Sequence, residues 1–431
     1  MTITKEDLTE SFSLDYYVLL PIAGLMGGLL IDTFLDQRWG VVVGFMSIGL
    51  GFFLLGTHGG SWSLPMAGAC LMVGFGTGKV AKLAYFGNFI RTQGFALEGG
   101  YALFGLAFSL AAILTGLAIT FLLDQSQWLV GGLMLGTGAL SIAIGVVWMA
   151  GILMGWLPDS QMEIPNPSRN RKIGALGIIL LVPVMMGLTW LLHIIPFKNF
   201  GLVLVSASLL AVIGGFIYVF RQPGINVARR NAILAVLLLG QMLNRTMMGI
   251  WYNMNFLQNG SSDLLSVNGI QNIGLAVFGI ALGALLLLVG SGKRRDLGGN
   301  GVGMLVGIGL QVLFVGLGPI IVSIFPDSVV IVIFLLLISG LGDTLWSTFA
   351  NGTMWRLSPP QFRTTTFALF MAMPSLGVLW IQDRPMDIGG KPILGLGIWE
   401  ITILAVGIGL AVGLWALLRN DSQSVEVFGK E

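Results

Sequence analysis

The chain has 431 residues, of which 55% are hydrophobic and only 10% are charged, and its formal net charge is +2. A soluble domain carries about 25% charged residues, so this composition excludes a water-soluble globule and indicates a protein of the lipid bilayer. Because the basic residues form no continuous surface, the sequence also excludes a nucleic-acid-binding role.

Thirteen apolar runs, separated by short polar breaks, are long enough to predict transmembrane helices. The first five are expected near residues 16–33, 39–57, 64–89, 101–123 and 128–157. Two more are expected near 173–195 and 200–220. The last six are expected near 231–257, 267–289, 302–325, 329–355, 362–381 and 394–418. We therefore predict an all-α polytopic membrane protein with about 13 transmembrane helices.

The basic residues predict the orientation of these helices. Cytoplasmic loops carry an excess of Lys and Arg. If the first loop is cytoplasmic, alternate loops receive most of the 22 basic residues, among them Arg38, Arg91 and the cluster 293–295. This places the N-terminus outside and the C-terminus in the cytoplasm.

The first run ends in a charged turn, GGLLIDTFLDQRWGVVVG, in which Asp36 and Arg38 follow Asp32. A carboxylate there can accept hydrogen bonds from the N-terminus of a neighbouring helix or pair with an arginine, and so hold two helices together in one state of a moving protein. An ordinary solvated loop is the alternative. The stretch resembles the loop signature that the major facilitator superfamily (MFS) carries between its second and third helices.

A second stretch, GDTLWSTFANGTMWRLSPPQFRTTTFALFMA at residues 342–372, resembles the tenth and eleventh helices of proton-dependent oligopeptide (POT) transporters. In that family a Gly-Glu pair opens the motif, and a basic residue, Pro-Pro and a final Arg close it. Asp343 stands where the family has glutamate, and Arg356 and Arg363 stand on matching positions. The resemblance implies that Asp32 belongs to one gating loop and Arg363 to the corresponding loop of the other half.

The order of the runs extends this resemblance to most of the chain. Bacterial POT members carry two extra helices between two six-helix bundles, and the sixth and seventh runs fit these. The first run then matches the family's second helix, so the family's first helix and its Glu-x-x-Glu-Arg motif have no counterpart here. The expected organisation is an N-terminal bundle at 1–157, a linker with two extra helices at 158–228, a C-terminal bundle at 229–420 and a cytoplasmic tail at 421–431.

Polar residues gather in the eighth run, GQMLNRTMMGIWYNMNF. Gln241, Asn244, Arg245 and Tyr252 share one broad face at 3.6 residues per turn. They suit a polar cavity in which Arg245 recognises a carboxylate. Interhelical hydrogen bonds and a displaced helix end are the alternatives. The family usually has a glutamate in this helix, and none is present here.

Two lysines lie in the third run, GFGTGKVAKLAYFGN. The family carries a lysine after a Gly-x-Gly in the matching helix, but neither Lys79 nor Lys82 has the usual spacing. A lysine in mid-membrane costs about 2.5 to 3.5 kcal/mol on insertion scales, which favours a function for one that is central. The alternative is that both lie near the cytoplasmic end and extend their ammonium groups to the interface.

Asp343 is an isolated carboxylate within an apolar run. Such a group either titrates or finds a cation, so a proton-carrying role and a structural ion pair are both open. In either case we expect its side chain to lie inside the protein rather than against lipid.

The sequence predicts no enzyme, metal or cofactor chemistry. It contains no Ser-His-Asp arrangement and no set of metal ligands at a suitable spacing. His58 and His193 are expected at the surface near the ends of runs, and Cys70 is expected to be a small buried hydrophobe.

Two functions from different classes remain. The first is a secondary transporter in the lipid bilayer, expected in the bacterial inner membrane, that moves a peptide or small polar solute by alternating access. The second is a degenerate transporter fold that serves as a subunit of a larger membrane complex, with a helix of a membrane-protein partner in place of the missing first helix. A weaker third reading keeps the fold and changes the cargo to a pigment or lipid.

Overall fold

The computed structural model describes most of the chain. The described residues are 5–57, 62–93, 96–123, 127–158, 167–194, 197–222, 227–253, 267–290, 297–325, 328–358 and 360–382, with a few more between 406 and 413. Within these ranges the chain is almost entirely helical and contains no strand. The predicted all-α class is therefore confirmed.

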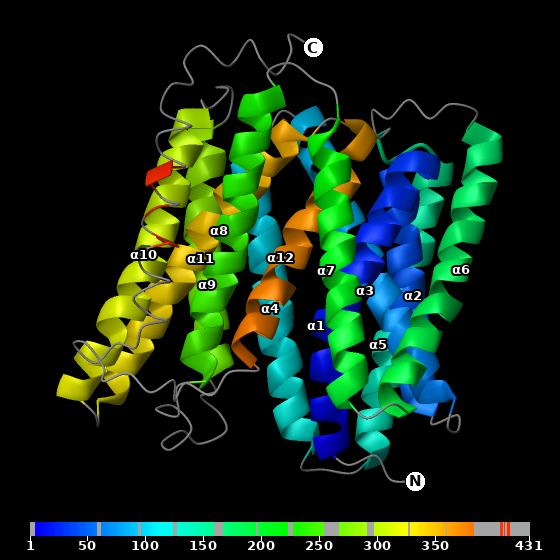
Figure 1. Cartoon of the computed structure of the whole chain (residues 1–431), viewed down its shortest axis with the longest axis horizontal. Helices are drawn as coiled ribbons and strands as arrows, with labels where there is room; N and C mark the ends of the chain where they lie inside the picture. The colour runs from blue at the N-terminus through cyan, green and yellow to red at the C-terminus, as the bar shows by residue number, and fades with distance from the viewer. Residues whose placement is uncertain are drawn as a thin grey trace. The chain divides into compact units, whose positions relative to one another are not determined.

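Twelve long helices correspond to the first twelve predicted runs (Figure 1). They are α1 (Lys5–Phe34), α2 (Gln37–Thr57), α3 (Ser63–Thr92), α4 (Leu97–Leu123), α5 (Gln127–Leu153), α6 (Pro167–Ile194), α7 (Phe197–Phe220), α8 (Val227–Asn253), α9 (Val267–Gly290), α10 (Leu297–Ile324), α11 (Val329–Leu357) and α12 (Arg363–Gln382). A short 3-10 helix, η2 (Pro360–Phe362), precedes α12. Nearly all of the thirteenth run, 394–418, lies outside the described residues, so the total of 13 and the orientation of the termini stay predictions.

Five helical stretches of the described chain are long and apolar enough to cross a membrane. They are Gln37–Thr57, Ser63–Thr92, Gly131–Leu153, Lys172–Leu191 and Ile333–Leu357. Their apolar side chains and internally bonded backbone are what a bilayer requires of a spanning segment.

By contacts, the chain forms two compact units that are not continuous in sequence. Unit 1 comprises Met1–Phe89, Leu122–Gln222 and Ser358–Leu376, and unit 2 comprises Ile90–Phe121, Pro223–Leu357 and Gly377–Glu431. The start of α12 therefore belongs with the early helices, and most of α4 belongs with the late ones. The division into bundles 1–157 and 229–420 remains a prediction.

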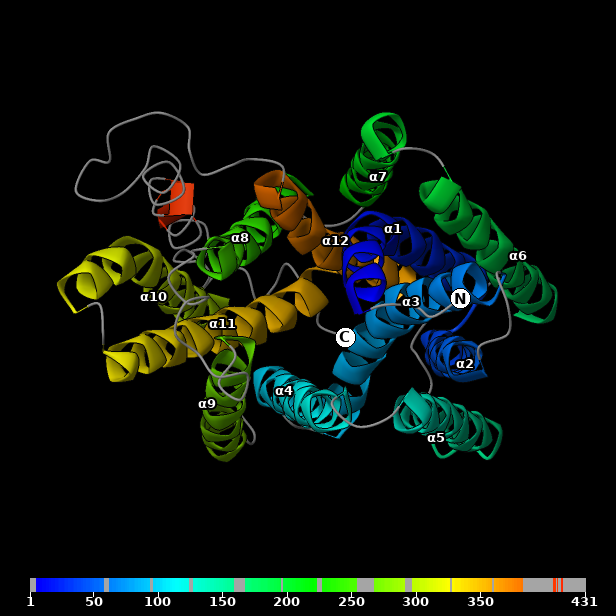
Figure 2. The ribbon, with the colours of Figure 1, turned by 90° about the horizontal axis from the view of Figure 1, so that it is seen from below.

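Glycines allow the helices of unit 1 to approach closely. A Cβ added to Gly138 of α5 would lie 2.8 Å from the backbone oxygen of Gly49 in α2. A Cβ added to Gly78 of α3 would lie 2.7 Å from Cα of Gly44, also in α2. Helices α6 and α7, the expected extra pair, both contact α1 (Figure 2). This packing places the charged end of α1 among several helices.

In unit 2, α11 packs against α8, α9 and α10. A Cβ on Gly307 of α10 would lie 2.6 Å from the backbone nitrogen of Trp346, and one on Gly342 of α11 would lie 2.9 Å from the Gly307 oxygen. Small residues at such contacts let helix backbones meet within a membrane. Polar residues of α8 and α11 are consequently held at short range.

Candidate functional site

The end of α1 meets the start of α12 through Asp32. Its carboxylate accepts hydrogen bonds from the backbone N–H groups of Thr364, at 3.0 Å, and Thr365, at 2.6 Å. The Thr365 hydroxyl donates a third, at 2.7 Å. A carboxylate in the last turn of its own helix is unfavourably placed in the helix dipole, and the positive N-terminus of α12 offsets this. Asp32 therefore joins α1 to α12, the first of the two geometries expected from the sequence.

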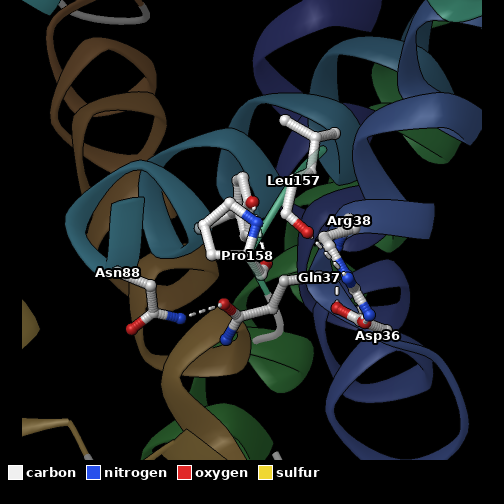
Figure 3. A network of polar contacts seen from close by, with 7 residues as sticks. Asp36, Gln37, Arg38, Asn88, Leu157 and Pro158 are labelled. Carbon is white, nitrogen blue, oxygen red and sulfur yellow. Dashed lines mark hydrogen bonds and ion pairs between the residues drawn. The ribbon is translucent and has the colours of Figure 1, made fainter. Parts of the chain in front are cut away.

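Arg363 extends this junction to α3. Its guanidinium donates to the Ser358 carbonyl at 3.0 Å and to Oδ1 of Asn88 at 2.5 Å. Asn88 in turn donates through Nδ2 to Oε1 of Gln37 at 3.0 Å, as Figure 3 shows. The cation at the start of α12 is thus connected through two amides to the start of α2.

Asp36 and Arg38 pair with each other at the turn between α1 and α2. Their side chains form an ion pair of 2.5 Å, and the Arg38 backbone N–H also donates to Asp36 at 3.0 Å. Arg38 donates in addition to the Leu157 carbonyl at 3.2 Å (Figure 3). The next carbonyl, of Pro158, accepts from the Tyr85 hydroxyl at 2.9 Å. Two side chains from α2 and α3 thus hold the segment that follows α5.

Together these contacts form what we call the α1–α12 latch: Asp32, Asp36, Gln37, Arg38, Asn88, Thr364, Thr365 and Arg363. Hydrogen bonds to a charged group contribute about 1.5 to 3 kcal/mol each. Because two of the three Asp32 donors are backbone N–H groups of α12 and the third is the Thr365 hydroxyl, α1 and α12 cannot separate without breaking these bonds. The latch can hold unit 1 in one conformation.

The polar centre of unit 2 is formed by α8 and α11. Asp343 is only 4% exposed, as expected for a side chain inside the protein, and its Oδ1 accepts from Nδ2 of Asn244 at 2.6 Å. One turn away, the Trp346 indole N–H donates to Oε1 of Gln241 at 2.6 Å. Three of the polar residues expected to act together are therefore close neighbours.

The other two residues expected in this cluster lie on the same helix. Arg245 and Tyr252 belong to α8, but their side chains lie outside the described residues. His58 is also outside them, as is the side chain of His193 in α6. Cys70 is fully buried in α3, which confirms the prediction for it.

Arg356 has a partner that sequence reasoning missed. It forms an ion pair of 2.5 Å with Glu98, in the first turn of α4, whose carboxylate side chain is only 1% exposed. Close by, the Arg91 guanidinium lies over the ring of Trp355, 5.5 Å from its centroid. The one sequence signal for this contact was Glu98 itself, a single carboxylate at the start of an otherwise apolar run.

The two lysines of α3 are half-buried in unit 1. The Lys82 ammonium lies over the Phe45 ring of α2, 4.5 Å from its centroid, a cation–π contact of about 0.5 to 2 kcal/mol. Lys79 lies three positions earlier on the same helix face. A role of either lysine in substrate binding or proton coupling stays a prediction. Among the described residues, no group of three His, Cys, Asp or Glu side chains is placed to hold a metal ion.

No known family model matches the sequence, and no curated protein sequence matches it. Solved structures do match. A POT family transporter in complex with 5-aminolevulinic acid is similar with a TM-score of 0.64 and 17% identity, over 95% of this chain and 87% of that one. A POT family transporter in complex with a thioalcohol conjugated peptide gives a TM-score of 0.59 and 17% identity, over 97% and 88% of the two chains.

The human organic anion transporter MFSD10 (TETRAN) is also similar, with a TM-score of 0.51 and 13% identity, over 95% of this chain and 83% of that one. The three structures share their fold with this chain. Because their sequence identities to it are below 20%, the similarity shows the fold and nothing more. With the long apolar helices, they indicate an integral membrane protein. The resemblance inferred from residues 27–44 and 342–372 thus agrees with the three-dimensional comparison, and the chain has the fold of the POT family transporters within the MFS architecture.

Proposed function

We propose that this protein is a proton-coupled secondary transporter that moves a peptide or another small polar solute by alternating access. The observation that carries the proposal is the contact between Asp343 and Asn244. A carboxylate that is 4% exposed, within an apolar helix, has a neutral amide as its described partner on α8. An intramembrane ionisable residue costs several kcal/mol and marks a functional site by default.

This contact suits a group that binds and releases a solute better than a group that only stabilises the fold. Asn244 supplies one short hydrogen bond of 2.6 Å to Asp343 through a neutral amide, which has both donors and an acceptor to offer a solute. We propose that this contact rearranges when a solute binds. Gln241 and Trp346, bonded to each other at 2.6 Å, lie beside this contact on the same two helices.

The α1–α12 latch supplies the second part of the proposal, a gate. Alternating access requires a junction that is stable in one state and broken in another. The junction between Asp32 and the start of α12 is compact and built from few groups. We assign to it the closure of one side of the transporter, with Asp36, Arg38 and Arg363 as supporting residues.

The class of solute is proposed from the neighbours. Two similar structures contain 5-aminolevulinic acid and a conjugated peptide, both small polar molecules, and the third is an organic anion transporter. We propose the same class here, in the bacterial inner membrane, with the N-terminus outside and the C-terminus in the cytoplasm.

The proposal is tested in proteoliposomes that contain the full chain. Radiolabelled dialanine and 5-aminolevulinic acid serve as probes, with and without an inward proton gradient. We expect gradient-driven uptake of at least one probe, and loss of the gradient dependence in Asp343→Asn. The matched control is Thr353→Val, a buried position of the same helix whose hydroxyl donates to the Phe349 carbonyl at 2.8 Å.

Uptake that Asp343→Asn leaves fully gradient-dependent would refute the role of Asp343. The assembly-subunit alternative is tested by purification in mild detergent with mass spectrometry. A stoichiometric membrane partner, together with no uptake of either probe, would replace transport by that alternative.

A further inference from the structure

Helix α5 ends in a glycine turn that leaves the following side chains exposed. Gly155 has a φ of 71°, and a Cβ added to it would meet nothing within 4 Å. The backbone N–H of Trp156 donates to the Gly151 carbonyl at 2.9 Å, and that of Gly155 donates to the Ile152 carbonyl at 3.2 Å. This pair of bonds is a Schellman motif, which a left-handed glycine after the last helical turn permits. The turn ends α5 and leaves the Trp156 side chain 72% exposed.

A cavity of about 400 Å³ lies at this turn. Its lining comes from the first turn of α2, from the last turn of α5 and from the segment that follows α5, and it includes Arg38, Trp39, Ile152, Leu153, Leu157 and Pro158. Binding sites for small ligands have volumes of about 300 to 1,000 Å³. The cavity is therefore large enough to hold a small polar group.

Arg38 gives the cavity its charge. It is the only charged residue among the described residues that line the cavity. Its ion pair of 2.5 Å with Asp36 and its bond of 3.2 Å to the Leu157 carbonyl hold the guanidinium in place, as Figure 3 shows. Asp36 itself is not one of the lining residues. An occupant therefore meets a positioned guanidinium, a group whose planar set of N–H donors suits phosphate.

The cavity lies where two membrane-spanning helices end. Gln37–Thr57 and Gly131–Leu153 are both long and apolar enough to cross a membrane, and the cavity is lined by the first turn of one and the last turn of the other. Lipid headgroups lie just beyond the hydrocarbon core, so the ends of spanning helices reach them. Tryptophan is enriched at this level of a membrane, which suits Trp39 in the lining and Trp156 beside it.

Exposed apolar side chains lead from the rim of the cavity along α5. Leu153, in the lining, is 71% exposed, and Val146, seven positions earlier, is 44% exposed. Residues seven apart lie on one face of a helix, so these two side chains follow each other along α5. A soluble phosphate ester gains nothing from such a surface, whereas an acyl chain does. The cation and the apolar rim together favour a phospholipid over a soluble anion.

We propose that this cavity is a binding site for an anionic phospholipid, with the phosphate on Arg38 and one acyl chain along Leu153 and Val146. Basic pockets between transmembrane helices bind such headgroups in membrane proteins. The site lies wholly in unit 1 and does not depend on the transport proposed above. Because Arg38 belongs to the α1–α12 latch, a lipid that binds the latched conformation stabilises that conformation by mass action.

The test is native mass spectrometry of the full-length protein, purified in mild detergent and depleted of lipid. Phosphatidylglycerol is the probe, and phosphatidylcholine, which has no net charge, is the comparison. We expect the first phosphatidylglycerol to bind about fivefold more tightly or better than the first phosphatidylcholine. Glycerol phosphate, added at the same concentration as the lipid, should not displace it. Equal affinities for the two lipids would overturn the anionic site, and displacement by glycerol phosphate would assign the cavity to a soluble anion instead.

Two substitutions at Leu153 test the site while leaving the contacts of Arg38 in place. Because Leu153 is exposed, neither Leu153→Glu nor Leu153→Gln removes buried packing. The two variants have side chains of similar size and differ in charge. A glutamate repels an anionic headgroup and competes for Arg38, so Leu153→Glu should bind phosphatidylglycerol about fivefold more weakly than Leu153→Gln, or worse. Equal affinities of these two variants would overturn the proposal.

Substitutions of Arg38 test the cation itself. Arg38→Gln should weaken the binding of phosphatidylglycerol about fivefold or more, whereas Arg38→Lys, which keeps the charge, should weaken it less. The matched control is Arg221→Gln, at an exposed arginine that follows α7 and does not line the cavity. We expect no change there. An equal loss in Arg38→Gln and Arg221→Gln would mean that lipid responds to the net charge of the protein rather than to this cavity, and would reject the site.

Discussion

Units 1 and 2 each bury an aspartate in a helix, and the two differ in what holds the carboxylate. Asp32 accepts from two backbone N–H groups and a hydroxyl at the start of α12. Asp343 accepts from the amide side chain of Asn244. Backbone donors move only when their helix moves, whereas a side-chain amide can rotate. The same residue type therefore accepts from backbone donors of a neighbouring helix in unit 1 and from a side-chain amide of a neighbouring helix in unit 2.

The largest effect is expected on the free energy of unfolding when Asp32 is replaced. Asp32→Ala leaves the donors of Thr364 and Thr365 without their acceptor, so the free energy of unfolding should fall by about 3 kcal/mol or more. Asp343→Asn keeps a polar partner for Asn244 and should lower it by less than about 1 kcal/mol. Unfolding in mixed detergent micelles measures both. Equal losses at the two positions would show that backbone and side-chain donors contribute equally to stability here.

The next effect concerns the packing that brings the polar centre of unit 2 together. Gly307→Ala places a methyl group 2.6 Å from the Trp346 nitrogen, a backbone atom that cannot move aside, so about 1 to 3 kcal/mol should be lost. The matched control is Gly309→Ala on the same helix, where a Cβ meets nothing within 4 Å. There we expect no loss, because alanine also has the higher helix propensity. Thermal unfolding of the two variants side by side decides the point.

A smaller effect is expected from the ion pair of Glu98 and Arg356. Because the arginine side chain is 21% exposed, solvent screens the pair, and we expect a coupling of about 1 to 2 kcal/mol. The double-mutant cycle of Glu98→Gln and Arg356→Gln measures it from unfolding free energies. Additive losses would show that the pair adds no stability, and Arg356 would then act through its contacts to solvent alone.

Sequence reasoning was most successful where one helix carried the whole signal. The apolar runs predicted twelve helices, because lipid demands long uninterrupted apolar segments. Eleven of them begin and end within six residues of the prediction, but α1 begins at Lys5, eleven residues before the predicted start, because its first turns are polar. Of the geometries open to Asp32, a contact with a helix N-terminus or an arginine and a solvated loop, the structure has the first, at the start of α12. The charged turn at the end of an apolar run carried this signal, but not which helix would supply the N-terminus.

Contacts between helices that are far apart in the chain could not be predicted from the sequence. Glu98 and Arg356 lie on helices far apart in the chain, and neither has a periodic pattern that points to the other. The hydrogen bond between Asn88 and Gln37 could not be predicted either, because a single amide in an apolar run gives no indication of its partner. The grouping of most of α4 with the late helices by contacts could not be read from the runs either, because which helices pack together depends on three-dimensional contacts.

The smallest effect is expected at the edge of the latch, where Tyr85 holds the Pro158 carbonyl. Tyr85→Phe removes one hydrogen bond of 2.9 Å and keeps the ring against Trp148, whose centroid lies 5.9 Å away. We expect a loss of about 0.5 to 1 kcal/mol, since a neutral bond is replaced by bonds to water on unfolding. Tyr85→Leu removes the ring contact as well and should cost more. If the two variants lost the same amount, the ring would contribute nothing, and the hydroxyl alone would anchor the segment after α5 to the latch.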